Sequence, residues 1–356
     1  MTVPEPISAM PTSRRTLLTT ALASATLGAA GCEPRANRAV PASVRGLDPA
    51  RLAQGFASLA ARAAPAVLNL GVMTLDTLAV WCADDNRRFP MQGLVMAPLA
   101  AAALAEVDAG RLKLNEAIPI RDVDLSPPPS RINRVLSSGA GHIDLRAADL
   151  IALAVQENDN TAADVLMERI GGPGAVTAWL QQHDIKEMRV DRYQREVQTG
   201  LVGMESFRTA WTEEAAWAAA RASVPPPLRE GASARFLADP RDTTSAEAAL
   251  NFLNQLSGGT LLSHVSTSLL LRLMSATAGP NPLREGLPAH VRLAQQSGVS
   301  PTDLGLTPAA NAMGVVTLPN NRRFVIAVFL AGSTATAAQR DDLIAGAARL
   351  VVSALS

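Results

Sequence analysis

Strand-like stretches lie at both ends of this sequence, and a largely helical stretch lies between them. Residues 66–83 contain two short apolar runs joined by a turn, and residues 290–332 contain three more. The middle of the chain shows helical periodicity, for example in the alanine-rich residues 98–112, and a final amphipathic run covers residues 336–355. This order predicts an α+β fold. It has one antiparallel five-stranded sheet built from both chain ends, flanked by helices, with an all-helical lobe inserted.

Further helices are predicted from the spacing of apolar residues. They cover residues 49–63, 144–158, 161–172 and 173–184. Asp144 is expected to cap the second of these helices, because a carboxylate can accept hydrogen bonds from the free backbone N–H groups of a first turn. Residues 126–141, rich in Pro, Ser and Gly, are expected to form a loop.

The first 31 residues have the composition of an export signal. Arg14 and Arg15 precede an uncharged apolar run of about fifteen residues, a length typical of a signal peptide and short for a membrane span. The arginine pair resembles a twin-arginine signal, and "AAGC" resembles a lipobox, which predicts lipidation of Cys32 and membrane anchoring. The alternative is an ordinary signal peptide cut near Ala30. Both predict an exported protein of the periplasm or cell envelope.

The rest of the chain is predicted to be a short tether followed by one domain. Residues 32–48 are polar, contain prolines and lack periodicity, as in a flexible linker. Residues 49–356 form the domain. Its α/β lobe is expected at about 49–90 and 240–356, and its helical lobe at about 91–239. Cys82 lies in an apolar run and is expected to be a small buried side chain rather than a reactive thiol.

Composition limits the classes of partner. The 32 basic and 32 acidic side chains balance, so charge gives no reason to expect nucleic-acid binding. The four histidines are scattered singly without the spacing of metal ligands, so neither a metal site nor a cofactor is expected. We expect the protein to be monomeric.

Several stretches resemble, in order, the class A β-lactamase family of serine penicillin-recognising enzymes. They include "RRFPMQ" before an alanine-rich helix, "DNTAADVLMERIGGPGAVTAWL", "RVDRYQREVQ" and "GVVTLPNNRRFVIAVFLAGS". The resemblance covers about residues 50 to 356. It implies the fold of that family and an active site with four parts: a Ser-x-x-Lys nucleophile, a Ser-Asp-Asn motif, an omega-loop glutamate and a Lys-Thr-Gly strand.

The residues at those positions differ from the pattern that the resemblance implies. The nucleophile and its lysine correspond to Gly93 and Met96, which can neither attack a carbonyl nor accept a proton. The first serine of the second motif corresponds to Asn158, the omega-loop glutamate to Gln194 and the third-motif lysine to Gln296. The sequence therefore predicts a catalytically inactive member, a pseudoenzyme with no catalytic residues.

Three functions stay open at this point. The first is a protein that binds a cell-envelope ligand or a protein partner through the cleft where the family's active site would lie. The second is a β-lactamase with an unrecognised nucleophile, and the third is a scaffold or regulatory partner that does not use the cleft. For the first, the candidate ligand-binding residues are Gly93, Asn158, Asn160, Ser297, Gly298 and Val299, with backbone N–H groups at Gly93 and Val299.

Two details of that site are also predicted. Asn160 either contacts a ligand amide, as the resemblance implies, or caps a helix that begins near Thr161. The resemblance further implies that Asp159 braces a neighbouring loop. The uncharged Gln296 argues against a ligand that carries a carboxylate.

Overall fold

The structure is a computed structural model that describes residues 46–136, 141–279 and 281–355. These residues belong to the second of two compact units of the chain, which spans residues 42–356. The predicted export signal, its arginine pair and Cys32 lie outside the described residues. Their predicted roles therefore stay predictions.

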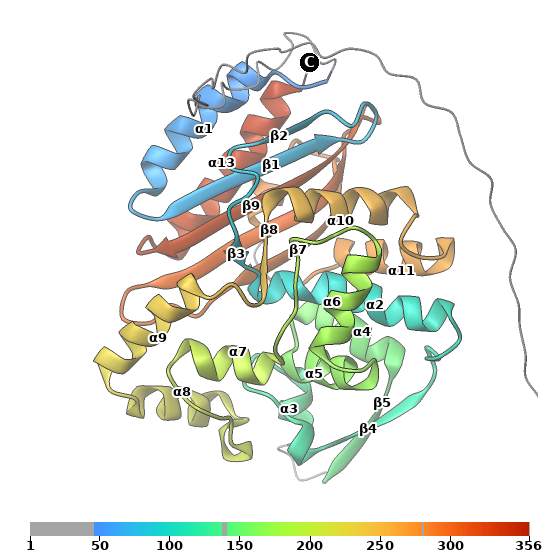
Figure 1. The fold of residues 1–356 in the computed structure, drawn as a ribbon, viewed down its shortest axis with the longest axis vertical. Helices are drawn as coiled ribbons and strands as arrows, with labels where there is room; N and C mark the ends of the chain where they lie inside the picture. The colour runs from blue at the N-terminus through green and yellow to red at the C-terminus, as the bar shows by residue number, and fades with distance from the viewer. Residues whose placement is uncertain (1–45, 137–140, 280, 356) are drawn as a thin grey trace, which may run out of the picture. The chain divides into compact units, whose positions relative to one another are not determined.

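The central element is a five-stranded antiparallel sheet whose strands come from both ends of the domain (Figure 1). The strand order is β2-β1-β9-β8-β7. The strands are β1 (Val67–Thr74), β2 (Val80–Cys82), β7 (Arg292–Val299), β8 (Thr307–Thr317) and β9 (Arg323–Ser333). The predicted α+β class and five-stranded sheet are confirmed.

Helices cover both faces of this sheet. Side chains alternate between the two faces along each strand, and because both sets are apolar, both faces need to be covered. In β9, Ile326 and Val328 join a core with α1 (Pro49–Ala63) and α13 (Ala337–Ala354). Ala327 and Phe329 join a second core with α10 (Ala246–Gly258). Helix α11 (His264–Ser275) packs beside β7.

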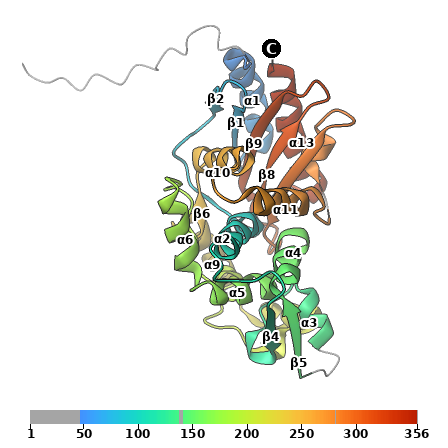
Figure 2. The same cartoon turned by 90° about the vertical axis from the view of Figure 1, so that its right-hand side faces the viewer.

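Helix α2 (Met96–Asp108) lies among the helices next to the sheet (Figure 2), and the second core continues around it. This helix is buried from Met96 to Leu104, and its alanines allow the neighbouring helices to approach closely. The other helices are α3 (Arg131–Leu136), α4 (Ala147–Glu157), α5 (Asn160–Arg169), α6 (Pro173–Gln182), α7 (Gln194–Leu201), α8 (Glu214–Ser223), α9 (Pro226–Ala238) and α12 (Pro282–Glu285). Two small sheets pair β3 (Phe89–Pro90) with β6 (Thr243–Thr244), and β4 (Ala117–Arg121) with β5 (His142–Arg146).

Two local predictions are wrong. Asp144 does not cap a helix, because it lies within β5 opposite Pro119, and α4 begins only at Ala147 after Arg146. The loop expected at residues 126–141 contains helix α3, where Ile132 and Leu136 are buried. In both places contacts with distant parts of the chain outweigh the local sequence preference.

Cys82 on β2 is partly buried and packs against the second core. Burial, with smaller contributions from nearby carboxylates, raises the pKa of its thiol to about 12. The thiolate form is therefore scarce at neutral pH, which agrees with the predicted lack of reactivity, although the side chain is partly rather than fully buried.

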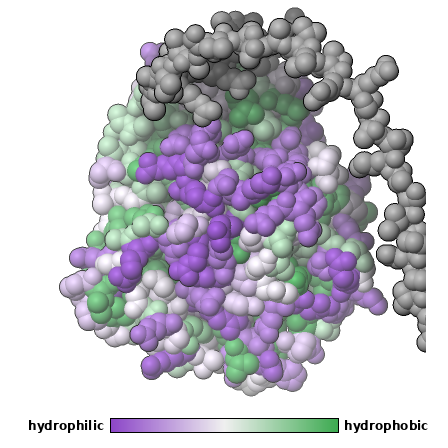
Figure 3. Space-filling model, viewed as in Figure 1, coloured by the Kyte–Doolittle hydropathy of each residue, from purple (hydrophilic) through white to green (hydrophobic). Residues whose placement is uncertain are grey.

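The surface of the described domain is mixed in character. On the face seen in Figure 1, hydrophilic side chains gather across the middle, with apolar side chains scattered around them (Figure 3). Among the helices that the structure describes, none is both long and apolar enough to cross a membrane.

Candidate functional site

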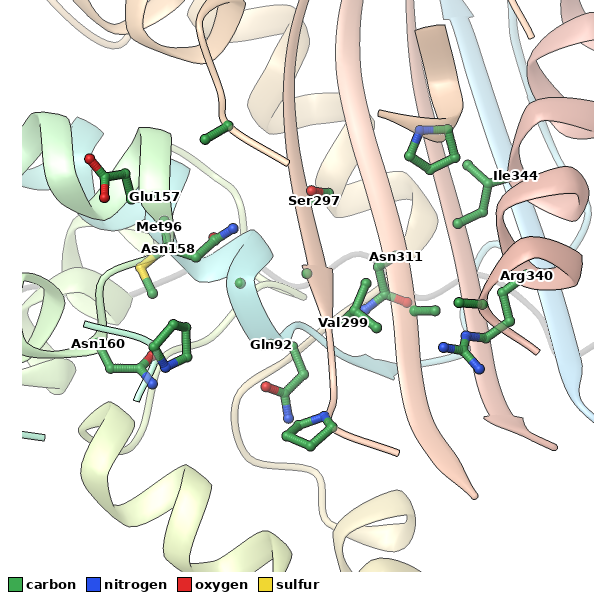
Figure 4. Close-up of a pocket in the computed structure, with 18 of the residues that line it drawn as sticks. Gln92, Met96, Glu157, Asn158, Asn160, Ser297, Val299, Asn311, Arg340 and Ile344 are labelled. Atoms are coloured by element: carbon green, nitrogen blue, oxygen red, sulfur yellow. The ribbon is translucent and has the colours of Figure 1, made fainter. Parts of the chain in front are cut away.

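A cleft lies beside β7, at the start of α2 and next to the turns that precede α5 and α7. It brings together eight of the predicted site residues: Gly93, Met96, Asn158, Asn160, Gln194, Ser297, Gly298 and Val299. Figure 4 shows Asn158 and Asn160 on one side and Ser297 and Val299 on the other. Gln296 does not line the cleft. It is only 1% exposed and lies behind the wall.

Gly93 stands where the backbone has no room for a side chain. It lies in the short 3-10 turn Gln92–Val95 that leads into α2. A β-carbon placed on Gly93 would lie 2.6 Å from Asn158 Oδ1 and 2.7 Å from the Ser297 carbonyl oxygen. Both distances are shorter than a normal van der Waals contact. The Asn158 amide therefore occupies the space that a side chain at position 93 would need.

Asn158 is held in that place by its backbone and by Gln296. It ends α4 in the left-handed conformation with φ of 52°, which asparagine tolerates better than most residues. Its Oδ1 accepts a hydrogen bond of 2.9 Å from Gln296 Nε2. The uncharged amide of Asn158, which lines the cleft, is thus joined to a second uncharged amide buried behind the cleft wall.

Gly298 brings β7 directly against the same turn. A β-carbon at Gly298 would collide with the backbone nitrogen of Gly93, and would lie 2.7 Å from Leu94 N and 2.8 Å from the Met91 carbonyl oxygen. All three neighbours are backbone atoms, which cannot rotate away as a side chain could. Glycine is therefore required here by close approach of two backbone segments.

Asp159, rather than Asn160, caps α5. The Asp159 carboxylate accepts hydrogen bonds from Ala162 N (2.9 Å) and from Arg131 N (2.6 Å) and Ile132 N. It therefore holds the first turn of α3, at the end of the loop that the resemblance implied it would brace, although burial raises its pKa. Asn160 begins the helix, and its Nδ2 donates to the Pro127 carbonyl (2.9 Å), so the predicted capping role of Asn160 is wrong.

Asp164 fixes the segment that carries Gln194, and sequence reasoning did not identify it. This carboxylate is fully buried, and it accepts hydrogen bonds from Gln194 N (2.5 Å), Arg195 N (2.9 Å) and Ser126 Oγ (2.6 Å). Burial raises its pKa, whereas these donors and the Arg195 guanidinium oppose that shift. The only sequence signal is an acidic residue on the buried face of a helix.

Three further cleft residues were also missed. Gln198 Nε2 donates to Gln92 Oε1 (3.3 Å), which adds another amide pair to the lining. Arg340 of α13 lies at the far end of the cleft, 7% exposed, with Nη1 donating to the Ala335 carbonyl (2.6 Å). Because this guanidinium supplies a cation, the neutrality of Gln296 does not exclude a ligand with a carboxylate. The expectation that a carboxylate-bearing ligand is disfavoured therefore stays a prediction.

Metal ligands are not gathered in this cleft. Within residues 46–136, 141–279 and 281–355, no group of three or more His, Cys, Asp or Glu side chains is arranged to hold a metal ion. The polar groups that line the cleft are mainly amides, with the Ser297 hydroxyl, the carboxylates of Glu157 and Asp341 and the guanidinium of Arg340. They suit hydrogen bonding to a polar ligand.

The family model described as "Beta-lactamase enzyme family" matches residues 51–355 of the chain, which include every described element of the cleft. The chain belongs to this beta-lactamase family. The match covers most of the chain and agrees with the class A resemblance drawn from the sequence.

Class A β-lactamases are found among the relatives by sequence and by structure. The chain is 28% identical over 278 residues to beta-lactamase VEB-1 of Pseudomonas aeruginosa, covering 77% of this chain and 80% of the relative. It is 27% identical over 282 residues to the extended-spectrum beta-lactamase PER-1 of the same organism, covering 76% and 80%.

Solved structures of the β-lactamase family share the fold. A beta-lactamase from Chitinophaga pinensis DSM 2588 superimposes with a TM-score of 0.68 at 27% identity, covering 84% of this chain and 97% of that one. The class A beta-lactamase of the last common ancestor of Gram-negative bacteria gives a TM-score of 0.66 at 30% identity, covering 85% and 98%.

Proposed function

We propose that this protein is a non-catalytic member of the class A β-lactamase family that binds a cell-envelope ligand or a protein partner through its cleft. One observation carries the proposal. Asn158 Oδ1 lies 2.6 Å from the position of a β-carbon on Gly93, so an amide fills the space of the expected nucleophile. An amide oxygen is a hydrogen-bond acceptor and not a usable nucleophile for acyl transfer.

The expected loss of rate and the cost of unpaired buried charges both favour binding over catalysis. Loss of the serine from a nucleophile–base unit costs about 10⁶ in rate. Met96, Gln194 and Gln296 are all uncharged, and they stand where the resemblance implies two lysines and a glutamate. Removing one charge from a buried cluster would leave an unpaired ion at a cost of about 3–5 kcal/mol, whereas joint neutrality avoids that cost.

Two other functions compete with this proposal. Family membership by itself is equally consistent with a β-lactamase that uses an unrecognised nucleophile. The hydrogen-bonded Asn158–Gln296 pair blocks the side-chain position at Gly93, so this alternative requires a nucleophile at some other position. A scaffold or regulatory partner that does not use the cleft is the third candidate. The cleft combines a largely apolar lining with a few polar side chains, which include Ser297 and Asn160, and this combination favours ligand binding.

Incubation with β-lactams tests the proposal directly. With a chromogenic cephalosporin we expect no turnover above buffer, and with a fluorescent penicillin we expect no mass added to the intact protein. Peptidoglycan fragments and penicillins should be screened by thermal shift, where a ligand that binds only the folded state raises Tm. Turnover or a covalent adduct would establish the β-lactamase alternative. No turnover, no adduct and no rise in Tm would together favour the scaffold.

The double variant Gly93→Ser/Met96→Lys is expected to remain inactive towards the same cephalosporin. The new serine would meet the Asn158 amide and the Ser297 carbonyl, and Gln194 and Gln296 would stay uncharged. The double variant should also be less stable than the parent by about 1–3 kcal/mol, as is usual for an overpacked core. Acylation of this variant, seen by intact mass, would show that the remaining positions do not prevent catalysis.

We further propose that the protein acts outside the cytoplasm, in the periplasm or cell envelope, as a monomer. The paired arginines and the "AAGC" sequence support export and lipidation at Cys32. Globomycin-sensitive processing with incorporation of labelled palmitate would support lipidation. Cleavage near Ala30 without label would support an ordinary signal peptide.

A further inference from the structure

A second concavity, the hairpin groove, lies between α3, β5 and α4. We define it by its lining residues: Arg131, Ile132, Val135, Ile143, Leu145, Asp149, Ala152, Leu153, Gln156 and Glu157. Glu157 lines both this groove and the cleft, and Pro129 of the cleft lies two residues before Arg131 of the groove. The two concavities therefore adjoin along the end of α4.

The floor of the hairpin groove is one half of an apolar sheet face. In the β4–β5 pair, Ile118 lies opposite Leu145 and Ile120 lies opposite Ile143, so all four side chains point to the same face. The β4 half of this face is buried in the core, whereas Ile143 and Leu145 stay partly exposed. Among the described residues of this face, apolar area therefore stays exposed at Ile143 and Leu145 of β5.

The backbone of β5 forms strand hydrogen bonds along one edge. β5 pairs with β4 along one edge, and its other edge pairs with no strand among the residues that the structure describes. A free strand edge presents a row of N–H and C=O groups that can pair with another extended chain. Here that edge adjoins an uncovered apolar floor, which would receive the inward side chains of an added strand.

Charge indicates what kind of chain would fit. The charged residues at the rim are already paired with one another, Arg131 with Glu157 (3.0 Å) and Arg146 with Asp149 (2.8 Å). An occupant therefore needs no charge of its own at its inward positions, and a charged side chain there would meet Ile143 and Leu145. Uncharged apolar side chains at alternate positions complement this floor.

We propose that the hairpin groove binds an extended peptide segment of a partner protein, which adds to the free edge of β5 as a strand and places uncharged apolar side chains at alternate positions on Ile143 and Leu145. β5 spans five residues, so the segment would be of similar length. Backbone hydrogen bonds supply affinity and the alternate side chains supply selectivity. This inference goes beyond the proposed cleft function, because it assigns a separate surface to a protein partner.

A random peptide library displayed on phage and selected on the full chain tests this inference. The peptides recovered should alternate apolar and polar residues. A recovered peptide, made synthetically with a fluorescent label, should bind at least about tenfold more weakly to Leu145→Asp, a loss of about 1.4 kcal/mol. Ile143→Thr, a milder variant, should weaken binding in the same direction. Asp144→Thr is the matched control, because Asp144 is exposed on the opposite face of β5, and it should bind as the parent does.

N-methylation separates strand addition from simple apolar contact. Methylating alternate backbone nitrogens of the selected peptide removes its N–H donors, and should weaken binding at least about tenfold where strand addition operates. Thermal melting of each variant verifies that it is folded. The inference is overturned if no peptide is enriched, if Leu145→Asp binds equally well or if the N-methylated peptide binds unchanged. It is also overturned if sedimentation shows that the groove pairs two copies of this chain.

Discussion

Replacement of Asp164 with alanine is expected to lower the free energy of unfolding by about 3–5 kcal/mol. The fully buried carboxylate accepts hydrogen bonds from Gln194 N, Arg195 N and Ser126 Oγ, and it faces the Arg195 guanidinium at 3.3 Å. Alanine would leave these donors without an acceptor in the interior and the guanidinium without its partner. Urea unfolding, monitored by tryptophan fluorescence, measures the change.

The control for this variant is Asp144→Ala, at an exposed position of β5. Surface substitutions of this kind usually change stability by less than about 0.5 kcal/mol. A loss below about 1 kcal/mol in Asp164→Ala would mean that water replaces the carboxylate without cost. The segment at Gln194 would then be positioned by other contacts.

Gly298→Ala should destabilise the protein by about 3 kcal/mol or more, at the upper end of overpacking costs. The added methyl group would collide with Gly93 N and lie 2.7 Å from Leu94 N and 2.8 Å from the Met91 carbonyl. Since these are backbone atoms, relief requires β7 and the turn before α2 to separate. We expect a lower urea midpoint and, if a cleft ligand is found, weaker binding of that ligand.

The matched control is Gly174→Ala on α6, where an added β-carbon meets nothing within 4 Å. At such a helical site the same substitution usually stabilises by about 0.4–1 kcal/mol, because alanine restricts the unfolded chain. Opposite signs at the two glycines would separate steric crowding from the general effect of replacing glycine. Equal effects would mean that β7 does not press on the turn.

Much of the fold could be predicted because the spacing of apolar residues in a long segment indicates whether it forms a helix or a strand. The helix predicted at 49–63 has the bounds of α1, and the three late strands appear as β7, β8 and β9. Asp144 was misjudged because a carboxylate before an apolar periodic run looks like a helix cap. Its actual partner across the hairpin, Pro119, lies far away in the sequence.

The candidate site was predicted residue by residue only where a motif could be aligned. The resemblance located Gly93, Asn158 and Gln296, and the structure brings these three together. Sequence could not indicate that Asn158 turns inward to fill the space beside Gly93, because that depends on its left-handed backbone and on Gln296. Arg340 was missed for a similar reason, since no local pattern indicates that a helix near the chain end reaches the cleft.

The strand order has a consequence for biosynthesis. β1 pairs with β9 along its full length, from Val67 opposite Ala331 to Thr74 opposite Phe324. A ribosome must therefore release nearly the whole polypeptide before β1 can pair with β9. Until then β1 can pair with its nearby neighbour β2, at Gly71, Val72 and Met73. Any transporter that accepts only finished folds would receive this protein after synthesis ends and never during it.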